Sequence, residues 1–402
     1  MDGTPDPNRR QLLSTLGIGA LGGFAGCTDA GDAEDNNEDG SETSAEPEDG
    51  DEPLEDDEAD EESQATDWPT YRADPTNAGY QPDVSGPEDP EIAWTAETDG
   101  AIYASPTVVD GVVYVGSYDE TVYALTTESG EENWSFDAGG NVFSSVTVAG
   151  SFAYVGGFDD AIHALSVEDG TEAERFETGG DVGSSPAIDS GTIYVGCDDG
   201  IVYALGENEW RTETGGEVVA SSAVADGTVY VGSFDETFYA LDAETGEEIW
   251  TIEGSGVFEG PAAVSNGSIF VGDRGGGFYA LDAETGTERW RFETGDWTGS
   301  GPATDGETVY VTNLDGAVYA LEAGDGTEQW SFQTGAEIWS SPTIAGETVF
   351  VVNQEGTVYA LDAADGTTQW SLSVGEVTFS SPAVVEDTLY IGSTDGSLYA
   401  LR

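Results

Sequence analysis

The sequence is poor in side chains that bind metals or form crosslinks. Its 402 residues include no lysine, one histidine, two cysteines and one methionine. Two cysteines, Cys27 and Cys197, exclude a framework of several disulfides. With His163 as the single histidine, the chain also lacks the ligands for a zinc site of the usual Cys/His type.

Basic residues are equally scarce. Nine arginines stand against 81 acidic residues, which gives a formal net charge of −72. Such a surface repels phosphate, so nucleic acid and anionic lipid headgroups are poor candidate partners, and we expect no nucleic acid to bind. Self-repulsion of this size opposes the compact state in ordinary buffer, but at molar salt the Debye length falls to about 3 Å. The composition therefore predicts an acidic, halophilic protein, typical of a halophilic archaeon.

The N-terminal apolar run is short. Residues 12–25 are too few to cross a bilayer and are typical of the apolar part of a signal peptide. Arg9 and Arg10 precede this run and predict export by the twin-arginine route. The sequence "FAGC" resembles a lipobox, which implies cleavage before Cys27 and its lipidation. We therefore expect residues 1–27 to be a twin-arginine, lipoprotein-type signal. The mature protein would then be anchored by lipid alone at the outer face of the cell membrane.

Residues 28–66 form an acidic segment. They contain 19 acidic residues, a single leucine and no aromatic residue. This composition cannot bury enough apolar surface to offset the entropy of ordering the chain, so it predicts a disordered linker. Its fully extended length is about 130 Å, long enough to act as a stalk.

The rest of the chain repeats a unit of about 40 residues. The triplet Tyr-Ala-Leu recurs seven times, and His163 replaces the tyrosine in one further copy. A fixed period near 40 indicates stacked supersecondary units. Each unit alternates short β-branched or aromatic runs with Gly-containing turns, and helical periodicity is absent after the signal. The strands expected in one such unit are Pro342–Ala345, Thr348–Val352, Thr357–Asp362 and one near Thr368–Ser373.

Four antiparallel strands per unit predict an all-β propeller with eight blades. The last unit stops at Arg402, after its third strand, whereas a tryptophan segment around Trp94 precedes the first Tyr-Ala-Leu triplet. An unpaired edge strand in the last blade would promote aggregation. We therefore expect Glu91–Thr98 to supply the outer strand of the last blade, so that the N-terminal strand closes a propeller of residues 91–402.

The phrase "ALDAETGEEIW" resembles the tryptophan-docking motif of the pyrroloquinoline-quinone (PQQ) repeat, Ala-x-Asp-x-x-x-Gly-x-x-x-Trp. In such propellers the glycine turns the chain and the tryptophan ties blades together. The resemblance covers about residues 68–402, and the segment 67–80 is similar to the lead-in of this family, so we assign 67–90 to a lead-in segment. The three full copies of the docking motif contain Asp242, Gly246 and Trp250; Asp282, Gly286 and Trp290; and Asp362, Gly366 and Trp370.

This family implies two opposite functions. One branch contains quinone-dependent dehydrogenases, and the other contains non-catalytic scaffolds such as the lipoprotein propeller of the outer-membrane β-barrel assembly machinery. PQQ carries three carboxylates and needs several cations, but the propeller has six arginines, most of them beside the outer tryptophan positions. The dehydrogenases also carry a vicinal disulfide and long ligand-bearing loops that this chain lacks. The sequence thus favours a scaffold without catalytic residues, cofactor or metal, which binds envelope proteins or a small ligand. A PQQ-dependent dehydrogenase or quinone sensor is the alternative.

Aromatic residues recur three residues before the proline position of the inner strands, and Trp297 lies two residues further upstream of its own position. They are expected to surround one mouth of the central channel. They form either a partner or ligand surface or packing between blades. Arg274, in the turn "GDRGGG", is expected at a ligand-bearing end. The aromatic candidates are Tyr103, Phe143, Phe258, Trp297, Trp339 and Phe379.

The turns after the second strands carry a ring of acidic residues on that same end. They act either as turn formers or as a cation site. The ring contains Asp119, Asp159, Asp199, Asp235, Asp315, Glu355 and Asp395.

The remaining candidates are expected to be structural or to carry modifications. His163 and Cys197 occupy positions expected in the core. The repeated inner-strand serines are not expected to include a nucleophile. Asn133 and Asn266 lie in N-glycosylation sequons, which suit an exported protein. We expect a monomer.

Overall fold

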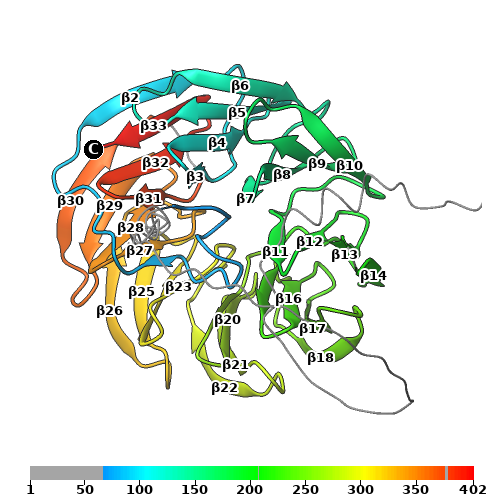
Figure 1. Cartoon of the computed structure of the whole chain (residues 1–402). Helices are drawn as coiled ribbons and strands as arrows, with labels where there is room; N and C mark the ends of the chain where they lie inside the picture. The colour runs from blue at the N-terminus through cyan, green and yellow to red at the C-terminus, as the bar shows by residue number, and fades with distance from the viewer. Residues whose placement is uncertain (1–66, 207, 376–378) are drawn as a thin grey trace, which may run out of the picture.

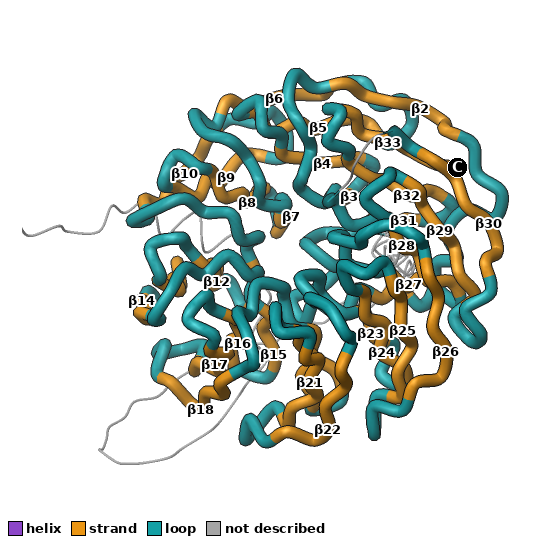
Figure 2. Tube along the Cα trace, turned by 180° about the vertical axis from the view of Figure 1, so that it is seen from behind, coloured by secondary structure: helices purple, strands orange, loops and turns teal. Residues whose placement is uncertain are grey.

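The computed structural model describes residues 67–206, 208–375 and 379–402. Within them all regular structure is β-strand, arranged as eight sheets in a closed ring (Figure 1). The view from behind in Figure 2 shows the same ring of strands joined by loops. No helix of these residues is long and apolar enough to cross a membrane. The predicted signal, the lipidation site Cys27 and the linker 28–66 lie outside the described residues.

The sheets follow one another along the chain as blades 1 to 8, and each blade runs from an inner to an outer strand. Blades 1 to 4 comprise β3 (Thr107–Val109), β4 (Val112–Gly116), β5 (Thr121–Thr126) and β6 (Glu132–Asp137); β7 (Thr147–Ala149), β8 (Phe152–Gly157), β9 (Ala161–Ser166) and β10 (Glu172–Glu177); β11 (Ala187–Asp189), β12 (Thr192–Gly196), β13 (Ile201–Leu205) and β14 (Trp210–Glu213); and β15 (Ala223–Ala225), β16 (Thr228–Gly232), β17 (Thr237–Asp242) and β18 (Glu248–Glu253).

Blades 5 to 8 repeat this order, and two strands of the N-terminal region join the last two of them. The strands are β19 (Ala263–Ser265), β20 (Ser268–Gly272), β21 (Gly277–Asp282) and β22 (Glu288–Glu293); β23 (Ala303–Thr304), β24 (Thr308–Thr312), β25 (Ala317–Glu322) and β26 (Glu328–Gln333); β27 (Thr343–Ala345), β28 (Thr348–Val352), β29 (Thr357–Asp362) and β30 (Thr368–Ser373), joined by β1 (Tyr80–Gln81); and β31 (Ala383–Val385), β32 (Thr388–Gly392) and β33 (Ser397–Leu401), joined by β2 (Ile92–Glu97).

The ring closes as the sequence predicts. Strand β2 pairs antiparallel with β33, from Ile92 opposite Leu401 to Glu97 opposite Ser397. The first and last strands of the propeller therefore lie side by side in blade 8, where cyan meets red in Figure 1. The strand predictions for blade 7 are confirmed, since only the start of the innermost strand differs, by one residue.

The apolar core lies between neighbouring blades. Each sheet is covered on both faces, so middle strands such as β28 are buried along their whole length and consist of continuous apolar runs. Outer strands alternate instead: from Gln369 to Ser373 the side chains of β30 are exposed and half-buried in turn. One interface illustrates the packing, where Tyr114 and Val122 of blade 1 contact Ala153 and Val155 of blade 2.

The docking motif fastens each blade to the next. The indole N–H of Trp250 donates to the carbonyl of Ala283 in the following blade, 3.1 Å away, and its ring covers Gly286. Gly286 has φ of +68°, and an added Cβ would clash with the indole, so the site requires glycine. Asp242 shapes the same turn of its own blade by accepting the backbone N–H of Thr245. Equivalent indole bonds are made by Trp94, Trp134, Trp210, Trp290 and Trp330.

Two places depart from this pattern. Glu174 occupies the tryptophan position of blade 2, so no indole at this position donates a hydrogen bond to blade 3. Trp370 of blade 7 faces blade 8, in which no turn connects the third strand β33 to the outer strand β2. Its indole donates instead to the carbonyl of Pro87 in the lead-in segment, 2.8 Å away. The lead-in segment thus replaces the turn that an uninterrupted eighth blade would supply.

The lead-in segment, residues 67–90, closes one end of the central channel. It crosses the middle of the ring, blue in Figure 1, and accepts backbone hydrogen bonds from six of the eight inner strands. Arg72 lies at its centre, 2% exposed, and donates to the carbonyls of Asn77 and Pro302. Burial lowers the pKa of this guanidinium. The donors on the inner strands are the N–H groups of Val108, Val148, Val224, Val264, Thr304 and Ile344.

Candidate functional site: the open mouth of the channel

The end of the channel opposite the lead-in segment, hereafter the mouth, holds a cavity of about 290 Å³. Its lining comes from repeated positions on successive blades. The residue two positions before the start of each inner strand supplies the first tier, here called the serine tier. The residue two positions before that one supplies a second tier. The turn between the second and third strands supplies a third tier. Tyr71 of the lead-in segment lies at the bottom. Because the tiers derive from equivalent positions, differences between blades alone give the mouth its asymmetry.

The serine tier is a hydrogen-bonded ring. The backbone N–H of Ser105 donates to the hydroxyl of Ser145 in the next blade, 3.0 Å away, and the pattern repeats around the channel. It is interrupted where Pro261 and Gly301 replace serine in blades 5 and 6. Each hydroxyl in the ring has the same structural role, and the absence of a serine nucleophile stays a prediction. The further donor–acceptor pairs are Ser145–Ser185, Ser185–Ser221, Gly301–Ser341, Ser341–Ser381 and Ser381–Ser105.

Seven aromatic side chains form a continuous arc around one side of the mouth. This aromatic arc consists of Phe158, Tyr118, Phe143, Tyr103, Phe379, Trp339 and Trp297. Its ring centroids are 4.5 Å apart between Tyr103 and Tyr118, 5.3 Å between Tyr103 and Phe379 and 4.9 Å between Trp297 and Trp339. Phe143 is 40% exposed, which is unusual for a phenylalanine. The arc spans blades 6, 7, 8, 1 and 2 and includes five of the six aromatic residues predicted at this mouth.

The sixth prediction, Phe258, is wrong. Phe258 is fully buried between blades 4 and 5, with its ring 5.5 Å from that of Phe238 and 5.9 Å from that of Tyr279. Alignment on the inner strands puts Pro261 at the serine position, one residue earlier than the proline of other blades. The residue at the mouth is consequently Glu259, and Phe258 shares its place with the buried Val182.

Arg274 lies at the mouth, as predicted, but is already paired. Its guanidinium lies 2.7 Å from the carboxylate of Glu259, and it stacks on Trp297 and Phe234 at 4.2 and 4.9 Å from the ring centroids. Burial raises the pKa of Glu259, while the bond from Arg274 opposes this shift. The only cation of the cavity rim among the described residues is therefore neutralised within the protein.

The side of the mouth opposite the arc carries carboxylates. This carboxylate side consists of Asp181, Asp198, Glu217 and Glu259. Asp198 lines the cavity, and one of its carboxylate oxygens is shielded from solvent without any hydrogen-bond partner. Burial, reinforced by the charges of Glu217 and Asp181, raises the pKa of Asp198 to about 6. Burial also raises the pKa of Asp181. The mouth is thus aromatic on one side and anionic on the other.

Five of the seven members of the acidic ring, all except Asp315 and Glu355, bond to a side chain of the third strand in their own blade. Asp199 accepts the hydroxyl of Tyr203 at 2.6 Å and the N–H of Ile201 at 3.0 Å, which holds the turn against the third strand. Asp119, Asp235 and Asp395 bind tyrosine in the same way. In the part of the chain that the structure describes, no three His, Cys, Asp or Glu residues are arranged to hold a metal ion.

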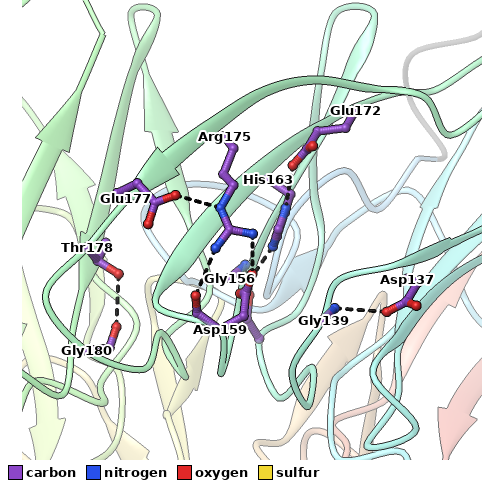
Figure 3. Close-up of polar contacts among 11 residues, drawn as sticks. Asp137, Gly139, Gly156, Asp159, His163, Glu172, Arg175, Glu177, Thr178 and Gly180 are labelled. Carbon is purple, nitrogen blue, oxygen red and sulfur yellow. Dashed lines mark hydrogen bonds and ion pairs between the residues drawn. The ribbon is translucent and has the colours of Figure 1, made fainter.

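His163 replaces that tyrosine in blade 2 (Figure 3). It is 1% exposed, and its ring nitrogens lie 3.2 Å from Asp159 and 2.8 Å from Glu172. Arg175 on the outer strand pairs with the same Asp159 at 2.6 Å. The cluster ties the turn to the third and fourth strands, so His163 lies in the core of its blade. Cys197 is likewise buried, and burial raises the pKa of its thiol to about 12.

The two sequon asparagines are both exposed, Asn133 on β6 and Asn266 in the turn between β19 and β20. Their positions are compatible with glycosylation, which stays a prediction.

Comparisons with known proteins agree with this architecture. The profile of the family described as outer membrane protein assembly factor BamB matches residues 84–170, 158–258, 253–338 and 293–402. The chain matches no curated protein.

Solved structures share the fold at low identity. BamB from Moraxella catarrhalis is 20% identical with a TM-score of 0.68, covering 78% of this chain and 99% of that one. Quinohemoprotein alcohol dehydrogenase from Comamonas testosteroni is 17% identical with a TM-score of 0.70, covering 84% of this chain and 80% of that one. A europium-containing methanol dehydrogenase is 14% identical with a TM-score of 0.73, covering 84% and 98%. These neighbours include both BamB and dehydrogenases, so the shared fold does not choose between the two functions. The profile spans most of the chain, from residue 84 to its last residue, and the chain therefore belongs to the family of PQQ-repeat propellers described as outer membrane protein assembly factor BamB.

Proposed function

We propose that this protein is a non-catalytic scaffold of the cell envelope that binds another protein through the mouth of its channel. The observation that carries the proposal is the aromatic arc, seven adjoining rings at the end of the channel that none of the described residues closes. Aromatic residues around a concave surface are the commonest anchors of protein interfaces. The lead-in segment covers the opposite end of the channel, so that end is not available to a partner.

The charges of the mouth support a scaffold over a quinone enzyme. PQQ bears three carboxylates, and the cavity presents Asp198 and Glu259 to it, while Arg274 is engaged with Glu259. In a cavity that is partly shielded from water, the carboxylates of PQQ and those of the protein would repel each other strongly. The residues of the mouth therefore do not fit this cofactor, and no step of a dehydrogenase mechanism is assigned to them.

Attachment to the envelope is part of the same proposal. The matching family is described as an outer membrane assembly factor, and the N-terminal sequence predicts export and a lipid at Cys27. The linker 28–66 would then hold a monomeric propeller away from the membrane on a stalk.

Site-specific crosslinking tests this proposal. A photoreactive phenylalanine analogue is placed at Trp339 in the full chain, expressed in its source cells. The matched control places it at Ile249, which is 48% exposed on the outer strand β18. We expect a discrete adduct with one envelope protein from Trp339 and none from Ile249. Equal adducts from both positions would contradict a binding mouth. Reduction of a dye by the purified chain with PQQ, calcium and an alcohol would contradict the non-catalytic role.

A further inference from the structure

Asp198 is a half-buried aspartate on the carboxylate side of the mouth. One of its oxygens is shielded from solvent and has no hydrogen-bond partner, although the residue lines the cavity. Asp181, Asp199 and Glu217 surround it with further negative charge. No ion pair joins Asp198 to an arginine of the described residues. A desolvated carboxylate without a donor is costly, and a positively charged donor relieves that cost most effectively.

The protein already shows how this mouth holds a guanidinium. Arg274 pairs with Glu259 at 2.7 Å while its guanidinium lies over Trp297 and Phe234. Stacking on aromatic faces combined with a carboxylate partner is the arrangement for which the planar guanidinium is best suited. Arg291 and Arg211 likewise stack on the tyrosines of their own blades, at 4.8 and 5.3 Å from the ring centroids.

The cavity near Asp198 also combines a carboxylate with aromatic rings, but no arginine of the described residues pairs with it. Asp198 occupies the turn position that holds Phe158 in the preceding blade and Phe234 in the following one. Beside it, Gly183 stands where the arc has an aromatic ring in other blades. A Cβ added at Gly183 would not clash, since its nearest neighbour would be Phe158 at 3.6 Å. The absence of a side chain at Gly183 therefore leaves space in the cavity.

We propose that the cavity receives an arginine side chain of the partner protein, with its guanidinium against Asp198 and its hydrocarbon stem along the aromatic arc. The inference rests on the proposed function, since it names the group by which the partner is recognised. A lysine would satisfy the charge but not the stacking on flat rings. An anionic ligand would meet the carboxylate side, and a neutral sugar would leave the charge of Asp198 uncompensated. The net charge of −72 further favours a cationic group.

Binding of defined probes to the purified full chain tests this inference. The probes are capped pentapeptides with a central arginine, lysine or citrulline between glycines, titrated calorimetrically in molar KCl at about pH 8, where Asp198 is ionised. Citrulline keeps the shape of arginine without its charge. We expect the arginine peptide to bind at least about tenfold more tightly than the citrulline peptide, and more tightly than the lysine peptide. Asp198→Asn should remove about tenfold of the affinity for arginine. The control Glu213→Gln, at an exposed outer-strand carboxylate, should leave it unchanged.

Several results would overturn the inference. Equal affinity for arginine and citrulline, or for the parent and a folded Asp198→Asn variant, would exclude recognition of a guanidinium at this carboxylate. Binding of free butylguanidine as tight as that of the peptide would show that the site serves a small cation rather than a partner protein. If the peptides fail but Trp339 still crosslinks specifically, the mouth remains the partner surface and only the arginine is wrong. Circular dichroism confirms that each variant is folded.

Discussion

The two ends of the channel are built from the same eight repeats but differ in how they are finished. At one end the lead-in segment binds backbone groups of six inner strands, and its central Arg72 is held by two carbonyls. At the other end nothing in the described chain covers the repeats, and side chains alone determine the surface. The serine tier is almost the same in every blade, whereas the two tiers above it vary from aromatic to acidic. In a repeat protein, positions that all blades share maintain the ring, and positions where the blades differ give it a function.

The largest effect is expected from removing the closed end. Deletion of residues 67–98 eliminates the lead-in segment, strand β2 and the acceptor of the Trp370 indole. We expect loss of a cooperative melting transition, because blade 8 then presents an unpaired edge. Deletion of residues 28–66, monitored by the same melting curve in molar KCl, serves as control and should have little effect. Similar curves for both deletions would contradict a structural role of the lead-in segment.

A pair of alanine substitutions separates packing from surface. Phe258→Ala removes a fully buried ring between blades and should lower the free energy of unfolding by about 3–5 kcal/mol. Trp339→Ala, at the partly exposed arc, should cost about 1 kcal/mol or less while abolishing the binding at the mouth. Denaturant titrations and peptide binding distinguish them. If the two variants lose stability equally, the aromatic arc is packing rather than a binding surface.

A smaller effect concerns pH and Asp198. Its pKa is about 6 in the folded protein, compared with about 3.9 for an unfolded aspartate, because burial and neighbouring carboxylates disfavour the charged form. As pH rises, the unfolded chain therefore loses this proton at lower pH than the folded protein does. The free energy of unfolding falls as pH rises from the unfolded pKa to the folded pKa. Asp198→Asn should remove this loss and melt about 1–2 °C higher than the parent at neutral pH. Melting curves from about pH 4 to 8 test this. If the melting temperatures of parent and variant differ by the same amount at both ends of that pH range, the charge of Asp198 is not the cause of the difference.

The smallest effect is expected in blade 2. His163→Tyr restores the residue of the other repeats, whose hydroxyl bonds to the aspartate four residues earlier, as Tyr203 does to Asp199. The substitution exchanges contacts with Asp159 and Glu172 for a single bond to Asp159. We expect a change in the free energy of unfolding within about 1 kcal/mol, measured by denaturant titration. A loss of several kcal/mol would show that the histidine has a role the repeat does not supply.

Much of the fold could be predicted from the sequence because the repeat is regular. The 40-residue period gives eight blades, and the missing fourth strand after Arg402 predicts the pairing of β2 with β33. The docking motif predicts the tryptophans that fasten the blades. The plug formed by residues 67–90 could not be derived this way, since its bonds run from backbone to backbone and leave no side-chain pattern.

The candidate site was only partly predictable. The spacing from proline predicts Tyr103, Trp339 and three other rings at the mouth, but it misplaces Phe258, because Pro261 lies one residue earlier than the proline of other blades. The alternation of side chains makes such a one-residue shift exchange surface for core. Asp198 carried no signal of its own, since the sequence also has an aspartate at the next position in most turns. Comparing the blades position by position would have distinguished it.

The pairing of β2 with β33 also determines when the protein can finish folding. Leu401 follows its partner Ile92 by 309 residues, so these strands meet only after all the repeats between them have been synthesised. At about 5–20 residues per second, the incomplete ring waits for roughly 15–60 s with β2 unpaired. A chain without its last blade leaves β2 without its partner β33, so closure of the ring requires all eight blades.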